Sequence, residues 1–156
     1  MNKRMLLTVL SAALLTGCWN STATTPATAD LKSLSRSMPA EEQDAYQFVG
    51  LLLQGDYKAI YQLMRDTEPT IQVSEEYVVS MLSLNFGYIP AGVSQCGGLD
   101  SFSLAKKVPV APGKEYHLTY KFSMKDKSDP KCAERNLPPI KAKLKGKLWD
   151  LILPMG

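Results

Sequence analysis

Apolar residues between Pro39 and Gly87 recur with the spacing of one helix face, in three successive stretches. Pro39 and the acidic residues after it can open the first helix, which Gly55 would close. Asp56 can cap a second helix, and Ser74 can cap a third that ends near Gly87. The pattern therefore predicts three helices, each with one buried face. The predicted buried positions are Ala45, Phe48, Val49 and Leu52; Tyr57, Ile60, Tyr61 and Met64; and Tyr77, Val78, Met81 and Leu82.

Beyond the third helix the apolar period changes to 2, which is the period of a β-strand. From Tyr116 to Met124 apolar and polar residues alternate cleanly, which predicts a strand with one buried face. Helices followed by such strands are typical of an α+β fold. The strands are expected at 102–110, 116–124, 140–144 and 148–153, with a short β-like piece at 70–73, a turn at 111–114 and a polar loop at 126–139.

An apolar run of eleven residues, Met5–Leu15, follows the basic residues Lys3 and Arg4. A membrane-spanning helix needs about 20 apolar residues, so this run is too short to be one. A basic start and a short apolar run are typical of a secretory signal peptide.

The next residues, Leu15-Thr16-Gly17-Cys18, resemble the lipobox of bacterial lipoprotein signal peptides. The resemblance implies removal of residues 1–17 and lipidation of Cys18 by diacylglycerol, usually with a further acyl chain such as palmitate. Two or more chains hold a protein on a membrane durably, whereas one binds reversibly. The alternative is an ordinary secretory signal in which Cys18 is an incidental thiol. Many inner-membrane lipoproteins of enteric type carry Asp after the cysteine. Trp19 stands there instead, so the resemblance implies the outer membrane, with the domain facing the periplasm.

Residues 18–37 are rich in Ser, Thr and Ala and have little apolar content before Leu31. Such a segment cannot bury enough surface to fold, so a flexible, lipidated tether is expected there. Residues 38–156 then form a single globular domain of about 120 residues, which is long enough to bury its own core.

Charge is distributed unevenly along the chain. Residues 18–103 contain four basic and ten acidic residues, whereas residues 104–156 contain twelve basic and five acidic residues. An anionic partner such as lipopolysaccharide, phospholipid headgroups or an acidic protein would explain the basic half. An acidic helical layer packed beside a basic sheet would also explain it, and the nearly neutral mature chain favours this second explanation. Nucleic acid is not expected as a partner of an exported protein.

Three cysteines occur, and the lipobox resemblance assigns Cys18 to the lipid. Cys96 and Cys132 remain as an even pair, which predicts a disulfide bond in an oxidising compartment. A metal site is the competing explanation, but two cysteines and the single histidine, His117, supply too few ligands.

No residue pattern typical of a catalytic centre occurs in the sequence. His117 lies on the polar side of its predicted strand, and there is no nucleophile elbow, glycine-rich phosphate loop or metal-ligand spacing. Glu41-Glu42 and Glu75-Glu76 are paired carboxylates, but helix starts favour acidic residues in any case. We therefore expect a protein that is not an enzyme and that uses no cofactor.

Four lysines alternate with other residues near the C-terminus: Lys141, Lys143, Lys145 and Lys147. Lysines of this kind solubilise a face or protect an edge strand from pairing with another chain, which is the favoured explanation. The alternative is a patch that contacts an anion or a protein partner.

The order of the predicted elements resembles that of nuclear transport factor 2-like and cystatin-like domains. The residues that carry the resemblance are Phe48-Val49 with Gly55-Asp56-Tyr57, and the closing Gly146-Lys147-Leu148-Trp149. The resemblance implies a cone-shaped α+β fold in which N-terminal helices pack on a curved antiparallel sheet. The concave side of that sheet holds a ligand in some members and only core side chains in others. No catalytic residue of the enzymatic members can be placed on this sequence.

Two functions from different classes fit these observations. The first is a non-catalytic lipoprotein of the cell envelope that binds a protein or small ligand, or that serves in a surface or secretion assembly. The second is a periplasmic inhibitor or immunity protein against a toxic hydrolase, for which a rigid, crosslinked domain is well suited. In both, the membrane is a partner through the lipid anchor, and an envelope protein is expected as a second partner.

The variant Cys18→Ser should not be acylated, because serine lacks the thiol that forms the thioether to the lipid. Metabolic labelling with radioactive palmitate in a bacterium that processes lipoproteins would measure this, with the unchanged chain as reference. Labelling that persists in the variant would contradict the lipid anchor.

Overall fold

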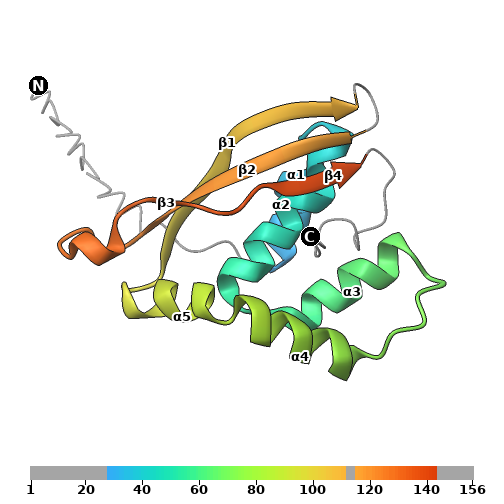
Figure 1. The fold of residues 1–156 in the computed structure, drawn as a ribbon, viewed down its shortest axis with the longest axis horizontal. Coiled ribbons are helices and arrows are strands. Elements are labelled where there is room, and N and C mark those ends of the chain that lie inside the picture. The colour runs from blue at the N-terminus through green and yellow to red at the C-terminus, as the bar shows by residue number, and fades with distance from the viewer. Residues whose placement is uncertain (1–27, 112–114, 144–156) are drawn as a thin grey trace, which may run out of the picture.

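The structure is a computed structural model that describes residues 28–111 and 115–143. Within these residues the helices precede an antiparallel sheet, so the fold is α+β, as predicted (Figure 1). In chain order the elements are α1 (Thr28–Ser35), α2 (Ala40–Gln54), α3 (Tyr57–Thr67), α4 (Glu75–Phe86), α5 (Tyr88–Gln95), β1 (Leu99–Ala111), β2 (Glu115–Met124), the 3-10 helix η1 (Pro130–Cys132), β3 (Arg135–Asn136) and β4 (Ile140–Lys143).

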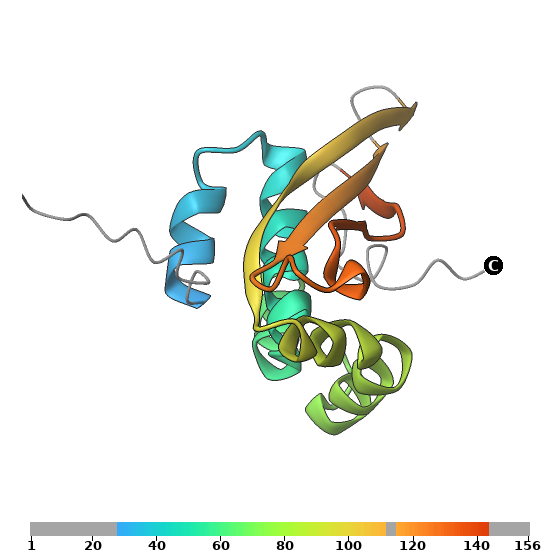
Figure 2. The same cartoon turned by 90° about the vertical axis from the view of Figure 1, so that its left-hand side faces the viewer.

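The sheet is built around β2. β1 pairs with one edge of β2, and β3 and β4 pair with two successive parts of the other edge. The register of β1 against β2 shifts at three points along its length. Because such irregularities bend a strand, β1 is visibly curved (Figure 2).

Helix α2 is the buried centre of the molecule. It contacts three other helices, α1, α3 and α5, and three strands, β1, β2 and β4. Residues 48–53 of this helix are all buried, so its second half has no side that faces solvent. Figures 1 and 2 show the sheet on one side of α2, α1 on another, and α3 to α5 grouped at one end.

The predicted helix starts are confirmed. Helix α2 begins directly after Pro39. The Asp56 carboxylate accepts a hydrogen bond of 3.0 Å from the backbone N–H of Ala59 at the start of α3. Ser74 Oγ accepts one of 3.2 Å from the backbone N–H of Tyr77 at the start of α4. Each cap satisfies a donor that has no partner inside its own helix.

Helix α4 buries less than its sequence predicts. Val78 and Leu82 are buried as predicted, but Tyr77 is 61% exposed. Tyr77 was predicted to face inward from its spacing alone. This prediction is wrong, because α4 packs mainly against α3 and α5 and only a narrow strip of its surface is buried there. Leu84 and Tyr88 are also exposed, and Gly87 between the two helices keeps a helical conformation. Tyr77, Leu84 and Tyr88 therefore follow one side of a continuous helical path, here called the α4–α5 stripe.

Helix α1 corrects the prediction that residues 18–37 form a flexible tether. Leu31 is 1% exposed, and it packs where α2 carries a glycine. A Cβ at Gly50 would lie 2.6 Å from Cδ2 of Leu31 and 3.1 Å from Cζ of Phe102, so only glycine leaves room for this approach. Residues 28–35 therefore belong to the folded domain, whereas residues 1–27, with Cys18, lie outside the described residues.

Helix α5 is absent from the prediction, because proline and glycine at residues 90 and 92 are usually read as helix breakers. Pro90 lies in the first turn, where its missing N–H costs no hydrogen bond. Ile89 and Val93, one turn apart, are buried. The prediction of a β-like piece at 70–73 is wrong, since these residues form a loop that buries Ile71.

The predicted strand at 116–124 is confirmed as β2. Its inward residues, Leu118, Tyr120, Phe122 and Met124, are buried. β1 includes the predicted 102–110 and starts three residues earlier. β4 supplies most of the predicted strand 140–144, whereas residues 112–114 and 144–156, including the predicted strand 148–153, lie outside the described residues.

The acidic helices and the basic sheet meet at Lys107 on β1. Its ammonium lies 2.5 Å from Oε1 of Glu41 and 2.9 Å from Oε1 of Glu42, both on α2. The hydrogen bond from Lys107 holds the pKa of Glu41 below its usual value, and the two glutamates raise the pKa of Lys107. The other ion pairs of the described residues join helix to helix or join residues from 99 onward, namely Lys32–Asp66, Lys58–Glu75, Lys121–Glu134, Lys127–Asp100 and Lys141–Glu115.

Replacing Leu31 by alanine should lower the free energy of unfolding by about 2 to 5 kcal/mol, because it empties the notch above Gly50. Leu34→Ala is the matched control on the same helix, since Leu34 is 47% exposed, and it should cost less than about 0.5 kcal/mol. Urea denaturation followed by circular dichroism measures both. Equal, small losses would show that α1 does not contribute to the core.

Candidate functional site

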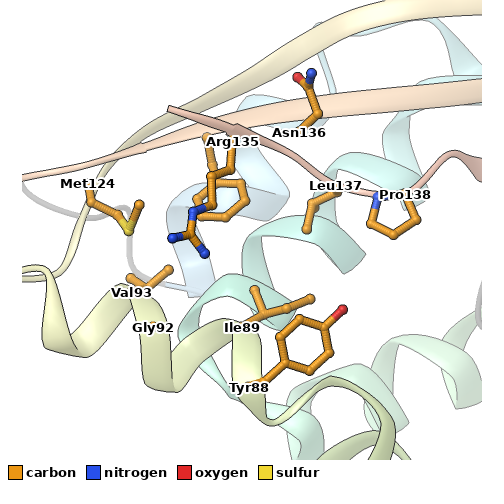
Figure 3. Close-up of a pocket in the computed structure, with 10 residues that line it drawn as sticks. Tyr88, Ile89, Gly92, Val93, Met124, Arg135, Asn136, Leu137 and Pro138 are labelled. Atoms are coloured by element: carbon orange, nitrogen blue, oxygen red, sulfur yellow. The ribbon is translucent and has the colours of Figure 1, made fainter. Parts of the chain in front are cut away.

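An apolar groove lies between α5 and the edge of the sheet where β3 joins β2 (Figure 3). Its volume is about 300 Å³, at the small end of the range for small-molecule sites. Helix α5 contributes Tyr88, Ile89, Gly92 and Val93; β2 contributes Phe122 and Met124; and β3 with the two residues after it contributes Arg135, Asn136, Leu137 and Pro138.

The floor of the groove is part of the hydrophobic core. Phe122 and Met124 come from the inward face of β2, and both are almost fully buried. Leu137 is 4% exposed, and its backbone N–H donates a hydrogen bond of 2.8 Å to the carbonyl of Tyr120. Because this wall is bonded to the backbone of the central strand, the groove has a fixed shape near Leu137.

Arg135 carries the charge in this lining. Its Nη2 donates a hydrogen bond to the backbone carbonyl of Lys131, which uses one of the five guanidinium donors. In Figure 3 the side chain of Arg135 extends from β3 toward α5 beside Met124, whereas Asn136 points away from the groove. Tyr88 stands at the other end, below Leu137 and Pro138. The groove is therefore apolar along its length and cationic at one end.

The predicted disulfide bond between Cys96 and Cys132 is present, and it joins the two walls of this groove. Their Cα atoms are 5.6 Å apart. Cys96 caps the C-terminus of α5, and Cys132 ends η1, three residues before Arg135. The crosslink therefore fixes the distance between the helix and the strand that carries the guanidinium.

The turn after α5 is also tied to the end of β2. The backbone N–H of Lys125 donates to the carbonyl of Gly98 at 2.9 Å, and that of Asp126 donates to the carbonyl of Cys96 at 3.0 Å. Gly97 and Gly98 have φ values of 74° and 100°, which glycine adopts without strain. This turn reverses the chain from α5 into β1 while holding the helix end against the sheet.

A larger hollow of about 500 Å³ beside η1 is less suited to a ligand, because its lysine, Lys127, already pairs with Asp100. The Asp100 carboxylate accepts a hydrogen bond of 3.2 Å from Ser123 and lies 3.0 Å from Nζ of Lys127. The Lys127 ammonium accordingly lowers the pKa of Asp100. A ligand there would have to displace these contacts.

A third hollow, of about 210 Å³, lies beside Tyr46 and Phe102. Tyr120 lines it, and its hydroxyl is buried with no hydrogen-bond partner among the described residues. Burial raises the pKa of Tyr120, so the phenol stays protonated. Ordered water commonly satisfies a buried hydroxyl of this kind. The carboxylate of Glu42 in the same hollow is already bonded to Lys107, which leaves little for a ligand to bind.

The lysines predicted as a patch are described only in part. Lys141 on β4 lies 3.3 Å from Glu115 on β2, so its charge is partly neutralised. The side chain of Lys143, and Lys145 and Lys147, lie outside the described residues. His117 is exposed and lies across the strands from Lys141. In the described part of the chain no three His, Cys, Asp or Glu side chains gather in a way that could hold a metal ion.

None of the residues that line the groove is among the site residues predicted from the sequence. The one signal that could have located its first wall is the spacing of Ile89 and Val93, which indicates a helical turn. No pattern indicates the second wall, because Arg135 and Leu137 lie in a polar segment without periodicity.

Comparison of the chain with models of protein families, with curated proteins and with solved structures finds no match. Among the helices that the structure describes, none has both the length and the apolar character needed to cross a bilayer.

Replacing both Cys96 and Cys132 by alanine should lower the free energy of unfolding by about 4 kcal/mol, because the bond closes a loop with a sequence separation of 36 residues. Denaturant titration of the variant measures the loss, and the unchanged protein treated with a reductant is the matched control. Labelling of either cysteine by iodoacetamide before reduction would contradict the crosslink.

Proposed function

We propose that this protein is a non-catalytic lipoprotein of the cell envelope that binds a small ligand in the groove between α5 and the β2–β3 edge. The groove itself is the observation that carries the proposal. It combines an apolar floor, one guanidinium and two walls held by a covalent crosslink. Pockets that bind small molecules typically combine an apolar lining with a few placed polar groups.

The composition of the lining supports binding rather than catalysis. The described residues that line the groove include no carboxylate, imidazole, thiol or aliphatic hydroxyl. General acid–base and nucleophilic catalysis depend mainly on such groups. Arginine can orient and neutralise a bound anion, which suits a protein that holds its ligand unchanged.

The three cysteines support the proposed location in the cell envelope. The Leu15-Thr16-Gly17-Cys18 string supports export and a lipid anchor at Cys18, and Trp19 supports the outer membrane with the domain in the periplasm. The Cys96–Cys132 bond supports an oxidising compartment. We also propose kinship with nuclear transport factor 2-like and cystatin-like domains, on the sequence resemblance carried by Phe48-Val49, Gly55-Asp56-Tyr57 and Gly146-Lys147-Leu148-Trp149.

One observation favours the second candidate function, inhibition of a toxic hydrolase. The C-terminal end of β1 and the start of β2 extend beyond the helices (Figure 2), and there Val108 is 38% and Val110 is 50% exposed. Lys106 lies on the same stretch of β1 and is exposed. A rigid apolar projection of this kind could enter the active site of another protein at little entropic cost.

The two candidates are separated by extracting the protein from envelopes under mild conditions and weighing it by native mass spectrometry. The proposed function predicts a bound small molecule that the variant Gly92→Phe loses, because the new side chain fills the groove. Val110→Asp is the matched control and should keep the molecule, since Val110 lies at the other end of the sheet. Extracted protein without any small molecule would contradict the proposal, and a hydrolase lost only from Val110→Asp would establish the inhibitor instead.

A further inference from the structure

The guanidinium of Arg135 lies at the groove, and no carboxylate of the described residues forms an ion pair with it. Its neighbour in the chain, Glu134, lies 3.4 Å from Nζ of Lys121 instead. No acidic residue is among the described residues that line the groove, and no ion pair joins Arg135 to one elsewhere in the described chain. A ligand that brings one negative charge would therefore complete the local charge balance.

A carboxylate matches this site better than a phosphate does. The planar fork of a guanidinium can donate two parallel hydrogen bonds to one carboxylate, and these charge-assisted bonds are among the stronger ones in proteins. A phosphate monoester carries a charge of about −1.5 to −2 and would call for a second cation. Among the described residues that line the groove, Arg135 is the only cation.

The rest of the groove fits an unbranched apolar chain. From Arg135 it runs past Leu137 to Tyr88 (Figure 3), and no other charged side chain is among the described residues that line it. The volume of about 300 Å³ is too small for a lipid with two chains. At its far end the α4–α5 stripe continues from Tyr88 to Leu84, which is 86% exposed, so a longer chain would still meet apolar surface.

We propose that the ligand of the groove is a fatty acid, whose carboxylate pairs with Arg135 and whose single acyl chain lies on Phe122 and Leu137 toward Tyr88. The inference rests on the proposed function and adds the class of the ligand. Three features together favour a fatty acid: a cation that forms no ion pair within the described residues, an apolar groove beside it, and the exposed α4–α5 stripe that extends the groove. Met124 lies beside Arg135 and offers a flexible side chain at the point where the acyl chain of the ligand would join its carboxylate.

Isothermal titration calorimetry with decanoate, 1-decanol and decyl phosphate tests the inference. The chain from Trp19 onward, exported with an unlipidated signal, retains every described residue and avoids competition from its own lipid. Decanoate should bind about tenfold or more tightly than 1-decanol, since the alcohol lacks the charge-assisted bond to Arg135. Arg135→Gln should lower the affinity for decanoate by a similar factor and leave the affinity for 1-decanol unchanged. Lys131→Gln is the matched control, because it removes a nearby charge while keeping the carbonyl that Arg135 contacts.

Position 92 gives a steric test that is independent of charge. A Cβ at Gly92 would meet no atom within 4 Å, so a larger residue can be introduced without a clash at the backbone. Gly92→Phe should abolish the binding of decanoate and 1-decanol alike, whereas Gly92→Ala should retain both. Thermal unfolding of the two variants confirms that each is folded.

Three results would overturn the inference: equal affinities for decanoate and 1-decanol, tighter binding of decyl phosphate than of decanoate, or decanoate binding that survives in Gly92→Phe. A result against the fatty acid can be distinguished from a result against the proposed ligand-binding function. Envelope-extracted protein that carries a molecule other than a fatty acid, lost in Gly92→Phe, would leave the proposed function standing and exclude this ligand.

Discussion

A covalent bond between two sulfur atoms sets the spacing on which the candidate site depends. β3 pairs with β2 through only two residues, and a pairing that short has little stability of its own. The segment that leads to it, residues 125–134, is mostly polar and exposed. The Cys96–Cys132 bond attaches this segment to the end of α5 and so holds the weakly paired β3 in place as one wall of the groove. The groove therefore exists because the crosslink compensates for a short strand.

The position of the groove at the margin of the sheet follows from how completely the centre is filled. Helix α2 is buried on all sides over residues 48–53, and the inward side chains of β2 pack with it into one continuous core. Leu31 fills the notch at Gly50 from the other side. Because large side chains fill the space between this part of α2 and the sheet, the candidate groove lies at a margin where the layers part, between α5 and β3.

Local chemistry made several elements predictable from sequence. Asp56 and Ser74 cap their helices as their positions suggest, and the strict alternation from Tyr116 to Met124 reports the buried face of β2. Where a result depends on a partner distant in sequence, local pattern fails. Leu31 of α1 is buried because it packs at Gly50 of α2, and Tyr77 stays exposed because no described element covers that side of α4. The strand that forms the floor of the groove and the disulfide bond at its margin could be predicted, but the meeting of α5 with β3 depends on such distant contacts and could not.

The early start of α1 also sets how far the domain can move from a membrane. The stretch from Cys18 to Ala27 is ten residues, and ten residues reach at most about 35 Å in any conformation. If Cys18 carries the proposed lipid, the folded part works within that distance of the bilayer surface. It would then exchange its ligand with the adjacent leaflet and could not ferry it across the periplasm to the opposite membrane.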